Sequence, residues 1–242
     1  FKKRYKFVIK WGEKTSTDDK IGATISSANV RPGLQDIQKN LKKFVGKIEQ
    51  IPPKFSAIKV NGKRAYRLAR KKTNFSLNSR TVFIETLKIK RQIDNDHCSF
   101  ECICSKGTYI RALARDLGEA MNCFGHIYEL RRTHVGKFSD KCSILLDLSE
   151  KLIHSSEILK NILPIEVVLK SLPFINLTKK QEFAIKNGQN ICLDELNIDE
   201  QKKKYFLGKS IDDYMICKNK NRIICFFKIE NNSVKPTRVF NL

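Results

Sequence analysis

Two hydrophobic periods meet within residues 98–121, and the rest of the chain is organised around that junction. Up to Cys104, apolar and polar positions alternate with a period of two, which predicts a strand. After residue 109 the apolar residues recur at steps of three and four, which predicts a helix with one apolar face. Residues 105–109 are therefore predicted to form a strand-to-helix turn, in which Gly107 supplies the backbone freedom that the turn needs.

Two cations flank the start of this predicted helix, where the helix macrodipole favours anions. They are Lys106 and Arg111, and a cation at this end costs about 0.3–1 kcal/mol. A compensating anion is therefore expected there, either a carboxylate from elsewhere in the chain or a phosphate of a ligand. The alternative is a surface arginine with its head group in water, and the spacing alone does not decide between the two.

The same patterns predict the remaining elements. Before residue 173 they indicate a strand over 5–11, a helix over 34–44, a tight turn at 61–62, a basic helical stretch over 63–72, and neighbouring strands over 82–90 and 98–104. Residues 143–169 have helical spacing that Pro164 interrupts. After residue 173 a capping-box pattern opens a helix at 178 that ends at 187–188, and short strands follow over 205–207, 214–217, 223–229 and 234–240.

These elements predict two domains, residues 1–172 and residues 173–242, with Pro173 at the boundary. The first is expected to be of the α+β or α/β class, with a mixed central sheet flanked by helices. A cleft is expected between the sheet and the loops that carry Tyr109 and Leu130. The second is expected to be a small, β-rich module.

Charge narrows the range of functions. Lysine and arginine number 47 against 25 acidic residues, a net charge of +22 over 242 residues, and such an excess is usually kept for a polyanionic partner, nucleic acid first. A general cationic bias of the source proteome is the alternative. The eight cysteines show no zinc-site spacing, and Cys102 and Cys104 are expected to be buried thiols in a reducing cytoplasm. No stretch approaches the length of a membrane span.

Three motifs follow one another along the first 138 residues. They are residues 44–59 (FVGKIEQIPPKFSAIK) with Gly62, Tyr66, Ala69 and Arg70, residues 104–111 (CSKGTYIR) with 116–118 (DLG), and residues 125–126 (GH) with 130–133 (LRRT) and 136–138 (GKF). In this order they resemble the TruB family of tRNA pseudouridine synthases, and the resemblance runs from about residue 3 to residue 138. After residue 173 it weakens to a similarity with that family's PUA-like RNA-binding domain.

The resemblance implies an enzyme that isomerises uridine-55 of the tRNA TΨC loop to pseudouridine by base flipping and nucleophilic Asp catalysis, without cofactor or metal. The family's nucleophile lies in a Gly-x-Leu-Asp-Pro motif, which is not found among these 242 residues. Residues 3–5 match the short family motif that follows it. The chain, which begins at Phe1, is therefore expected to be a segment that lacks its nucleophile and is inactive alone. Asp18 and Asp19 are not expected to replace that nucleophile.

The resemblance also implies roles for residues that match the family's motifs. Tyr5 matches the tyrosine that stacks on the flipped uracil and is proposed to help deprotonate C5, and Arg111 matches the arginine that pairs with the nucleophilic Asp. Tyr109 and Leu130 match positions that line the uracil pocket, although Tyr5 and Leu130 are also plausible core residues. Five cations are expected to contact RNA phosphates: Lys59, Arg70, Lys106, Arg131 and Arg132.

Two other interpretations stay open. One is a non-catalytic module that binds or folds tRNA, which the basic charge and the tail support equally well. The other is a guide-RNA-dependent relative, which the small tail and residues 50–59 disfavour. In either tRNA interpretation the partner is the T-arm of tRNA, and a cytoplasmic monomer without contact to a membrane is expected.

Overall fold

The computed structural model describes residues 2–144, 159–169, 172–209 and 214–240. Its contacts divide the chain into two units, Phe1–Leu145 and Leu146–Leu242, and each has a hydrophobic core of its own. The domain boundary at residue 173 stays a prediction from the sequence. Most of the helical spacing predicted over residues 143–169 falls outside the described residues, and the helix α5 (Ile165–Leu169) directly follows Pro164.

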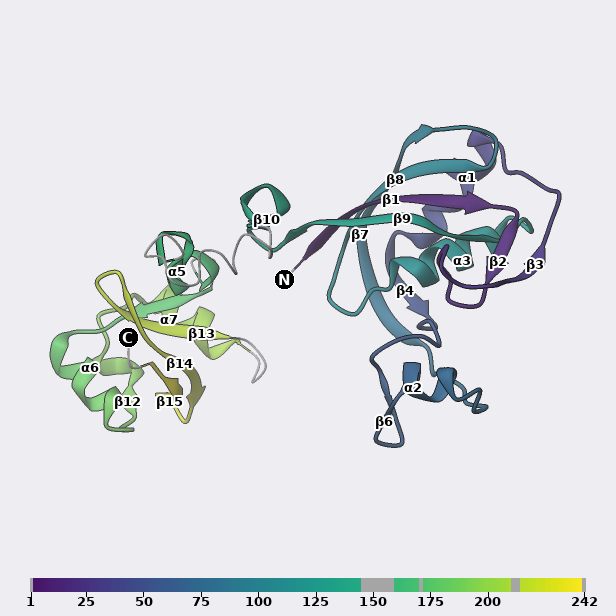
Figure 1. Ribbon diagram of the computed structural model, residues 1–242. Coiled ribbons are helices and arrows are strands. Elements are labelled where there is room, and N and C mark those ends of the chain that lie inside the picture. The colour runs from purple at the N-terminus through teal and green to yellow at the C-terminus, as the bar shows by residue number, and fades with distance from the viewer. Residues whose placement is uncertain (1, 145–158, 170–171, 210–213, 241–242) are drawn as a thin grey trace. The chain divides into compact units, whose positions relative to one another are not determined.

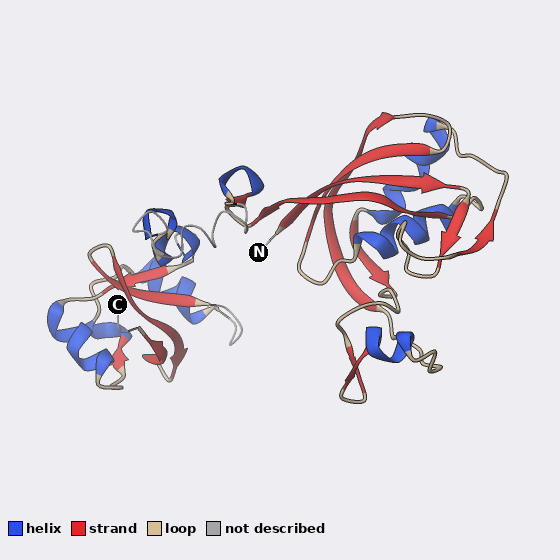
Figure 2. Cartoon of the chain, in the orientation of Figure 1, coloured by secondary structure: helices blue, strands red, loops and turns tan. Residues whose placement is uncertain are grey.

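The first unit is built on a six-stranded sheet with the order β10-β9-β1-β8-β7-β4 (Figures 1 and 2). Its strands are β1 (Lys3–Trp11), β4 (Gly46–Gln50), β7 (Arg80–Gln92), β8 (His97–Cys104), β9 (Gly125–Val135) and β10 (Phe138–Ser139). The predicted strands over 5–11, 82–90 and 98–104 are confirmed as β1, β7 and β8. The α+β fold class is confirmed as well.

The direction of the strands in this sheet differs from the prediction of a mixed sheet, because every pairing in it is antiparallel. The reason lies in the unit β8–α3–β9, where the helix α3 (Ile110–Ala120) leads the chain from one strand to another of the same direction. Such strands become parallel neighbours when they pair with each other. Here β1 lies between them and pairs antiparallel with both.

One face of the sheet carries the core of the first unit. Along β8 every second residue is buried, from Cys98 to Cys104, which is the alternation that a half-buried strand requires. The helices α1 (Leu34–Leu41) and α3 contribute their apolar faces to the same core. Phe7 stacks on Phe100 with ring centroids 5.4 Å apart, and Trp11 meets Phe100 edge to face.

Two small hairpins extend from the first unit. The strands β2 (Glu13–Thr15) and β3 (Thr24–Ser27) pair around a polar loop. The strands β5 (Lys59–Val60) and β6 (Lys63–Arg64) pair across the predicted turn, in which Asn61 and Gly62 both have positive φ. The basic helix α2 (Ala65–Arg70) follows, and Figure 1 shows β6 and α2 projecting beyond the end of β4.

The second unit is a five-stranded sheet with the order β11-β13-β14-β15-β12. Its strands are β11 (Phe174–Asn176), β12 (Ile191–Cys192), β13 (Met215–Asn219), β14 (Arg222–Glu230) and β15 (Ser233–Val239), and its longer helices are α6 (Lys179–Lys186) and α7 (Glu200–Leu207). Short 3₁₀ turns lie in both units: Lys42–Phe44 and Asp140–Cys142 in the first, and Leu159–Asn161 and Leu193–Glu195 in the second. The predicted capping box of α6 is confirmed.

One predicted element of the tail is wrong. Residues 205–207 were predicted as a strand and form the last turn of α7 instead. The helix begins because the Asp199 carboxylate caps it, accepting a hydrogen bond from the backbone N–H of Lys202 at 2.7 Å. Phe206 then turns into the core of the unit. The three lysines 202–204 lie on the same helix.

The close packing of α3 against the turn before β9 depends on Gly118. This buried residue faces the backbone of the turn, and a Cβ built on it would lie 2.4 Å from Gly125 N and from Phe124 C. These are backbone atoms of a tight turn in which Asn122 and Phe124 have positive φ. The turn therefore has little freedom to move away.

Gly118→Ala is expected to destabilise the first unit by about 2 kcal/mol, because overpacking against backbone outweighs the helix propensity gained. Urea unfolding followed by the fluorescence of Trp11, which is the one tryptophan and is buried, measures this. The control is Gly33→Ala, whose Cβ would meet only the flexible Asp36 carboxylate at 3.4 Å. It is expected to cost less than about 1 kcal/mol, and equal effects of the two substitutions would contradict the steric explanation.

Candidate functional site

A pocket of about 360 Å³ opens where β1 and β9 meet the start of α3. The residues that line it are Lys3, Tyr5, Gly107, Thr108, Tyr109, Ile110, Arg111 and Leu130. The four residues to which the family resemblance gives a role in the active site thus lie together: Tyr5, Tyr109, Arg111 and Leu130. They come from three elements and are separated by up to 125 positions in the sequence.

The topology of the sheet explains this gathering. The register places Tyr5 opposite Cys102 of β8 and opposite Arg132 of β9, so the end of β1 that carries Tyr5 lies beside the end of β8. From there the chain turns at Gly107, whose φ is +87°, and enters α3. The N-terminus of the helix, and with it Arg111, therefore lines the pocket.

Leu130 corrects the predicted cleft in one respect. It lies in the middle of β9 and not on a loop. Leu130 is 46% exposed. Its backbone pairs in register with that of Phe7 on β1. A core leucine would be covered, so core packing does not account for its position, and its exposed surface lines the pocket.

Tyr5 belongs to the core and to the pocket at once. It is 9% exposed and is one of the core residues of the first unit, as the alternative interpretation of this aromatic residue expected. Burial raises the pKa of its hydroxyl, while a hydrogen bond from Arg132 opposes that rise. The ring is consequently held in one place, and the hydroxyl is protonated at neutral pH.

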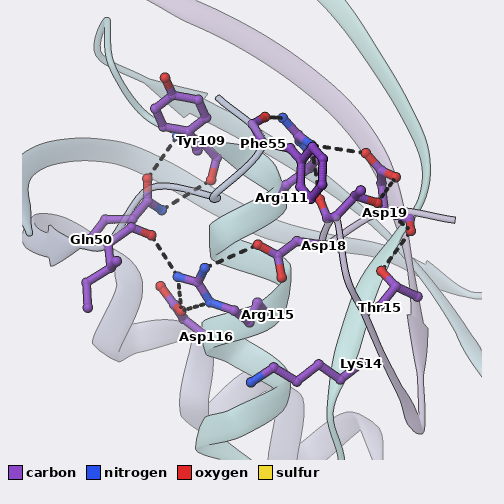
Figure 3. Close-up of polar contacts among 12 residues, drawn as sticks. Lys14, Thr15, Asp18, Asp19, Gln50, Phe55, Tyr109, Arg111, Arg115 and Asp116 are labelled. Carbon is purple, nitrogen blue, oxygen red and sulfur yellow. Dashed lines mark hydrogen bonds and ion pairs between the residues drawn. The ribbon is translucent and has the colours of Figure 1, made fainter. Parts of the chain in front are cut away.

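Arg111 is bound on two sides by oxygen atoms (Figure 3). Its Nη1 donates to the carbonyl of Thr17 at 3.0 Å and to Asp19 Oδ2 at 3.1 Å, and its Nη2 donates to the carbonyl of Phe55 at 2.8 Å. The side chain is about one quarter exposed. The cation at the helix N-terminus is thus compensated by a carboxylate from elsewhere in the chain, one of the two possibilities that its position predicted.

Asp19 is the residue of this site that sequence reasoning missed. Its Oδ1 accepts hydrogen bonds from Thr17 Oγ1 at 2.6 Å and from the backbone N–H of Ile21 at 3.2 Å, so its carboxylate is fixed by its own loop. Its Oδ2 is then free to face Arg111. The available signal was an acidic pair, Asp18 and Asp19, in a polar loop of a strongly basic chain, together with a cation that needed a partner.

A second arginine repeats the arrangement one helical turn later. Arg115 donates to Asp18 Oδ2 at 3.2 Å, to Asp116 Oδ1 at 2.8 Å and to the carbonyl of Ile51 at 2.7 Å. Burial raises the pKa of both carboxyl groups, and the charge of Arg115 opposes the rise. These groups border a second, larger hollow of about 1120 Å³ that contains none of the aromatic residues of the first pocket.

The predicted phosphate contacts lie outside the pocket. All five side chains are exposed, and none lines the pocket: Lys59, Arg70, Lys106, Arg131 and Arg132. Arg131 forms an ion pair with Asp140 at 2.6 Å, and Arg70 lies over the ring of Tyr66 at 5.5 Å. Arg132 forms a hydrogen bond to the pocket residue Tyr5, and the role of all five cations as phosphate contacts stays a prediction.

The described residues of the chain form neither a metal-binding cluster nor a membrane-spanning helix. These residues contain no group of three or more His, Cys, Asp or Glu side chains placed to hold a metal ion. They also contain no helix whose length and apolar character would let it cross a membrane.

Two family models match the chain. The model described as TruB family pseudouridylate synthase (N terminal domain) matches residues 1–110, and that of the tRNA pseudouridylate synthase B C-terminal domain matches residues 111–170. Among curated relatives, tRNA pseudouridine synthase B of Caulobacter sp. (strain K31) is 37% identical over 240 residues, which are 99% of this chain and 76% of that protein. The protein of the same name from Ehrlichia ruminantium (strain Gardel) is 37% identical over 243 residues, with 99% and 79% covered.

Solved structures share the fold. A chain of a Cbf5-Nop10-Gar1 complex superposes with a TM-score of 0.65 at 19% identity, covering 98% of this chain and 66% of that one. A chain of an H/ACA RNP bound to a substrate RNA containing 2'-deoxyuridine gives a TM-score of 0.64 at 18% identity, covering 100% and 66%. At such identities the likeness establishes the fold alone.

The raised pKa of Asp18 predicts a pH dependence of stability. Because its folded-state pKa lies above the ordinary value of 3.8, the folded state takes up the proton first. Wild type is therefore expected to gain stability relative to Asp18→Asn as the pH falls from neutral toward about 4. The control is Glu13, whose pKa is lowered by the hydrogen bond from Lys10, so wild type should lose stability relative to Glu13→Gln as the pH falls below the ordinary value of 4.5. Urea unfolding at several pH values measures both, and a common sign would refute the assignment.

Proposed function

Because this chain belongs to the TruB family of tRNA pseudouridine synthases, we propose that it serves to convert uridine-55 in the T loop of tRNA to pseudouridine. The observation that carries the proposal is the pocket that gathers Tyr5, Tyr109 and Leu130 with Arg111 at its mouth. A base inside a folded loop has to be extruded before it can react, and the extruded base needs a stacking surface and edge contacts. A pocket with two tyrosines and a leucine offers both.

In this proposal Arg111 orients the nucleophile. The carboxylate belongs to the family's Gly-x-Leu-Asp-Pro motif, which is not among these 242 residues. Within the described part of the chain Arg111 uses only its two Nη atoms, so its Nε–H is left to bind a further acceptor. A guanidinium fixed in this way keeps a neighbouring carboxylate ionised and aimed.

The reaction then needs three steps around the pocket. The base is flipped in, and the Asp carboxylate attacks as the bond between C1′ of the ribose and N1 of the uracil breaks. The ribose is then reattached by a bond between C1′ and C5, the C5 proton leaves, and N1 takes up a proton, so that the product is an isomer of the substrate. Tyr5 is the stacking surface. Burial raises the pKa of its hydroxyl and so favours the protonated form, and Arg132 is the cation that would stabilise the phenolate needed to accept a proton.

The partner in this proposal is the T-arm of tRNA. The net charge of +22 provides long-range attraction for a polyanion, and the exposed cations Lys59, Arg70 and Lys106 supply phosphate contacts around the pocket. The β-rich second unit is proposed to be a PUA-like domain that extends the RNA-binding surface. A cytoplasmic monomer without cofactor completes the proposal.

A second function, of a different class, is a module that binds or folds tRNA without chemistry. The net charge of +22 supports it as well as it supports the enzyme. We also propose that these 242 residues alone do not turn over uridine, because they do not include the Gly-x-Leu-Asp-Pro motif. The two functions differ in whether a protein that contains both the motif and these residues makes pseudouridine.

The deciding experiment incubates the intact gene product with unmodified tRNA transcript and maps pseudouridine at nucleotide resolution. We expect modification at uridine-55 and none in a transcript that carries cytidine there. The 242-residue chain is expected to bind the same tRNA without modifying it. Binding by the intact product with no pseudouridine in the T loop would leave the non-catalytic function in its place.

Arg111→Ala in the intact product is expected to lower turnover by at least about a thousandfold, because the nucleophile loses the cation that orients it. Affinity for tRNA is expected to stay within about threefold, since Arg111 donates to protein oxygens and not to phosphates. Single-turnover rates and equilibrium binding separate the two effects. Arg70→Ala, which changes an exposed cation, is the matched control and should weaken binding with little effect on the rate at saturation.

A further inference from the structure

Gln50 is the last residue of β4, and its side chain is buried at 2% exposure. The side-chain amide forms two hydrogen bonds with the backbone of one distant residue, Tyr109 (Figure 3). Its Oε1 accepts from the N–H of Tyr109 at 2.9 Å, and its Nε2 donates to the carbonyl of Tyr109 at 3.2 Å. A carboxamide can bind the N–H and the carbonyl of one residue in this way because it presents an acceptor and a donor side by side.

The start of α3 explains why this contact matters. Tyr109 is the N-cap residue of the helix and makes no side-chain capping hydrogen bond, since its hydroxyl stands far from its own backbone. In a capping box, a glutamate or glutamine at the third helical position accepts from the N–H of the N-cap residue. In α3 that position is Ala112, which has no such acceptor.

The second unit shows what is replaced. At the start of α6, Gln181 occupies the third helical position, and its Oε1 accepts from the N–H of Thr178 at 2.9 Å. Gln50 makes the equivalent hydrogen bond to Tyr109 at the same distance, from a strand 59 residues away. Gln50 therefore takes the part that Gln181 has in α6, while the Thr178 hydroxyl, which accepts from the N–H of Gln181, has no counterpart at Tyr109.

The neighbours of Gln50 fix it in turn. Gln50 pairs with Arg80 in the β4–β7 ladder, so its backbone belongs to the central sheet. The carbonyl of the next residue, Ile51, accepts from Arg115 at 2.7 Å, one turn beyond Arg111 on α3. The sheet edge and the first turns of the helix are therefore joined at residues 50 and 51. The backbone of Tyr109 at φ −102° and ψ 111° is held between them.

We propose that Gln50 is a positioning residue of the pocket, which sets the backbone of Tyr109 and, through the first turn of α3, the direction of Arg111. Its effect on catalysis rests on the proposed function, whereas its effect on Tyr109 does not. Gln50 does not line the pocket. It acts through the two residues that do.

The first test measures Tyr109 directly in the 242-residue chain. Labelling with ¹⁵N-tyrosine gives six amide signals, one for each tyrosine, and Tyr109→Phe assigns the signal of interest. Gln50→Met removes both hydrogen bonds at nearly constant volume, so the Tyr109 amide is expected to exchange with solvent about tenfold faster or more. The amide of Tyr5, on a strand that is paired on both sides, is the internal control and should change by less than about twofold.

Two further variants keep this test decisive. Gln50→Glu retains the acceptor for the Tyr109 N–H and loses the donor to its carbonyl, so the Tyr109 amide should stay near its wild-type rate. Gln38→Met, an exposed glutamine of α1, should change nothing. Unchanged exchange of Tyr109 in Gln50→Met would overturn the proposal, and so would equal acceleration of Tyr5 and Tyr109, which would report a general loss of stability.

The second test uses the intact gene product and unmodified tRNA. Gln50→Met is expected to lower kcat by about 10- to 100-fold, since displacement of a site residue by about 1 Å can cost about 100-fold in rate. The KM for tRNA should stay within about threefold, and Gln38→Met should match wild type. An unchanged kcat, or a change confined to KM, would overturn the catalytic role. Wild type without any turnover would instead refute the proposed function, and the exchange rates would still decide whether Gln50 positions Tyr109.

Discussion

The site depends on two guanidinium groups placed one helical turn apart on α3. Arg111 and Arg115 each join a carboxylate of the loop after β2 to a carbonyl of the segment after β4. Neither contact is a surface ion pair, because both arginine side chains are at least three-quarters covered. Partly buried ion pairs add little net stability, but removing one partner leaves a charge uncompensated and is costly. The paired arginines therefore define the geometry of three segments more than they add to their stability.

The order of the strands converts this local arrangement into a pocket. Because β1 lies between β8 and β9, the helix that links those two strands has to pass over β1. Its start lies beside the end of β1 that carries Tyr5, and Leu130 of β9 borders the same opening. Gln50 then binds the backbone N–H and carbonyl of Tyr109, the N-cap residue of this helix. The start of the helix is thus joined to the neighbouring sheet edge at the residue whose ring lines the pocket.

The sequence revealed those parts of this arrangement that depend on local pattern. The change of period at residue 104, the glycine turn and the helix start at residue 110 all follow from spacing, and the structure confirms them. The cation at the helix start also indicated that an anion was needed. The identity of that anion could not be predicted, because Asp19 lies 92 residues from Arg111 and meets it only through the fold. The strand predicted over residues 205–207 is wrong because these residues belong to a helix that the carboxylate of Asp199 caps.

Local charge around the two arginines of α3 runs against the charge of the whole chain. Three carboxylates, those of Asp18, Asp19 and Asp116, face the two guanidiniums, so this cluster is slightly acidic within a protein of net charge +22. A phosphate placed beside the cluster would meet these carboxylates and donors that are already bound to protein oxygens. The phosphates of an RNA are better served by the exposed cations outside the pocket, which include Lys59 and Lys106. In the proposed function, attraction of a polyanion and orientation of reacting groups are therefore assigned to different residues, and a substitution in one set need not disturb the other.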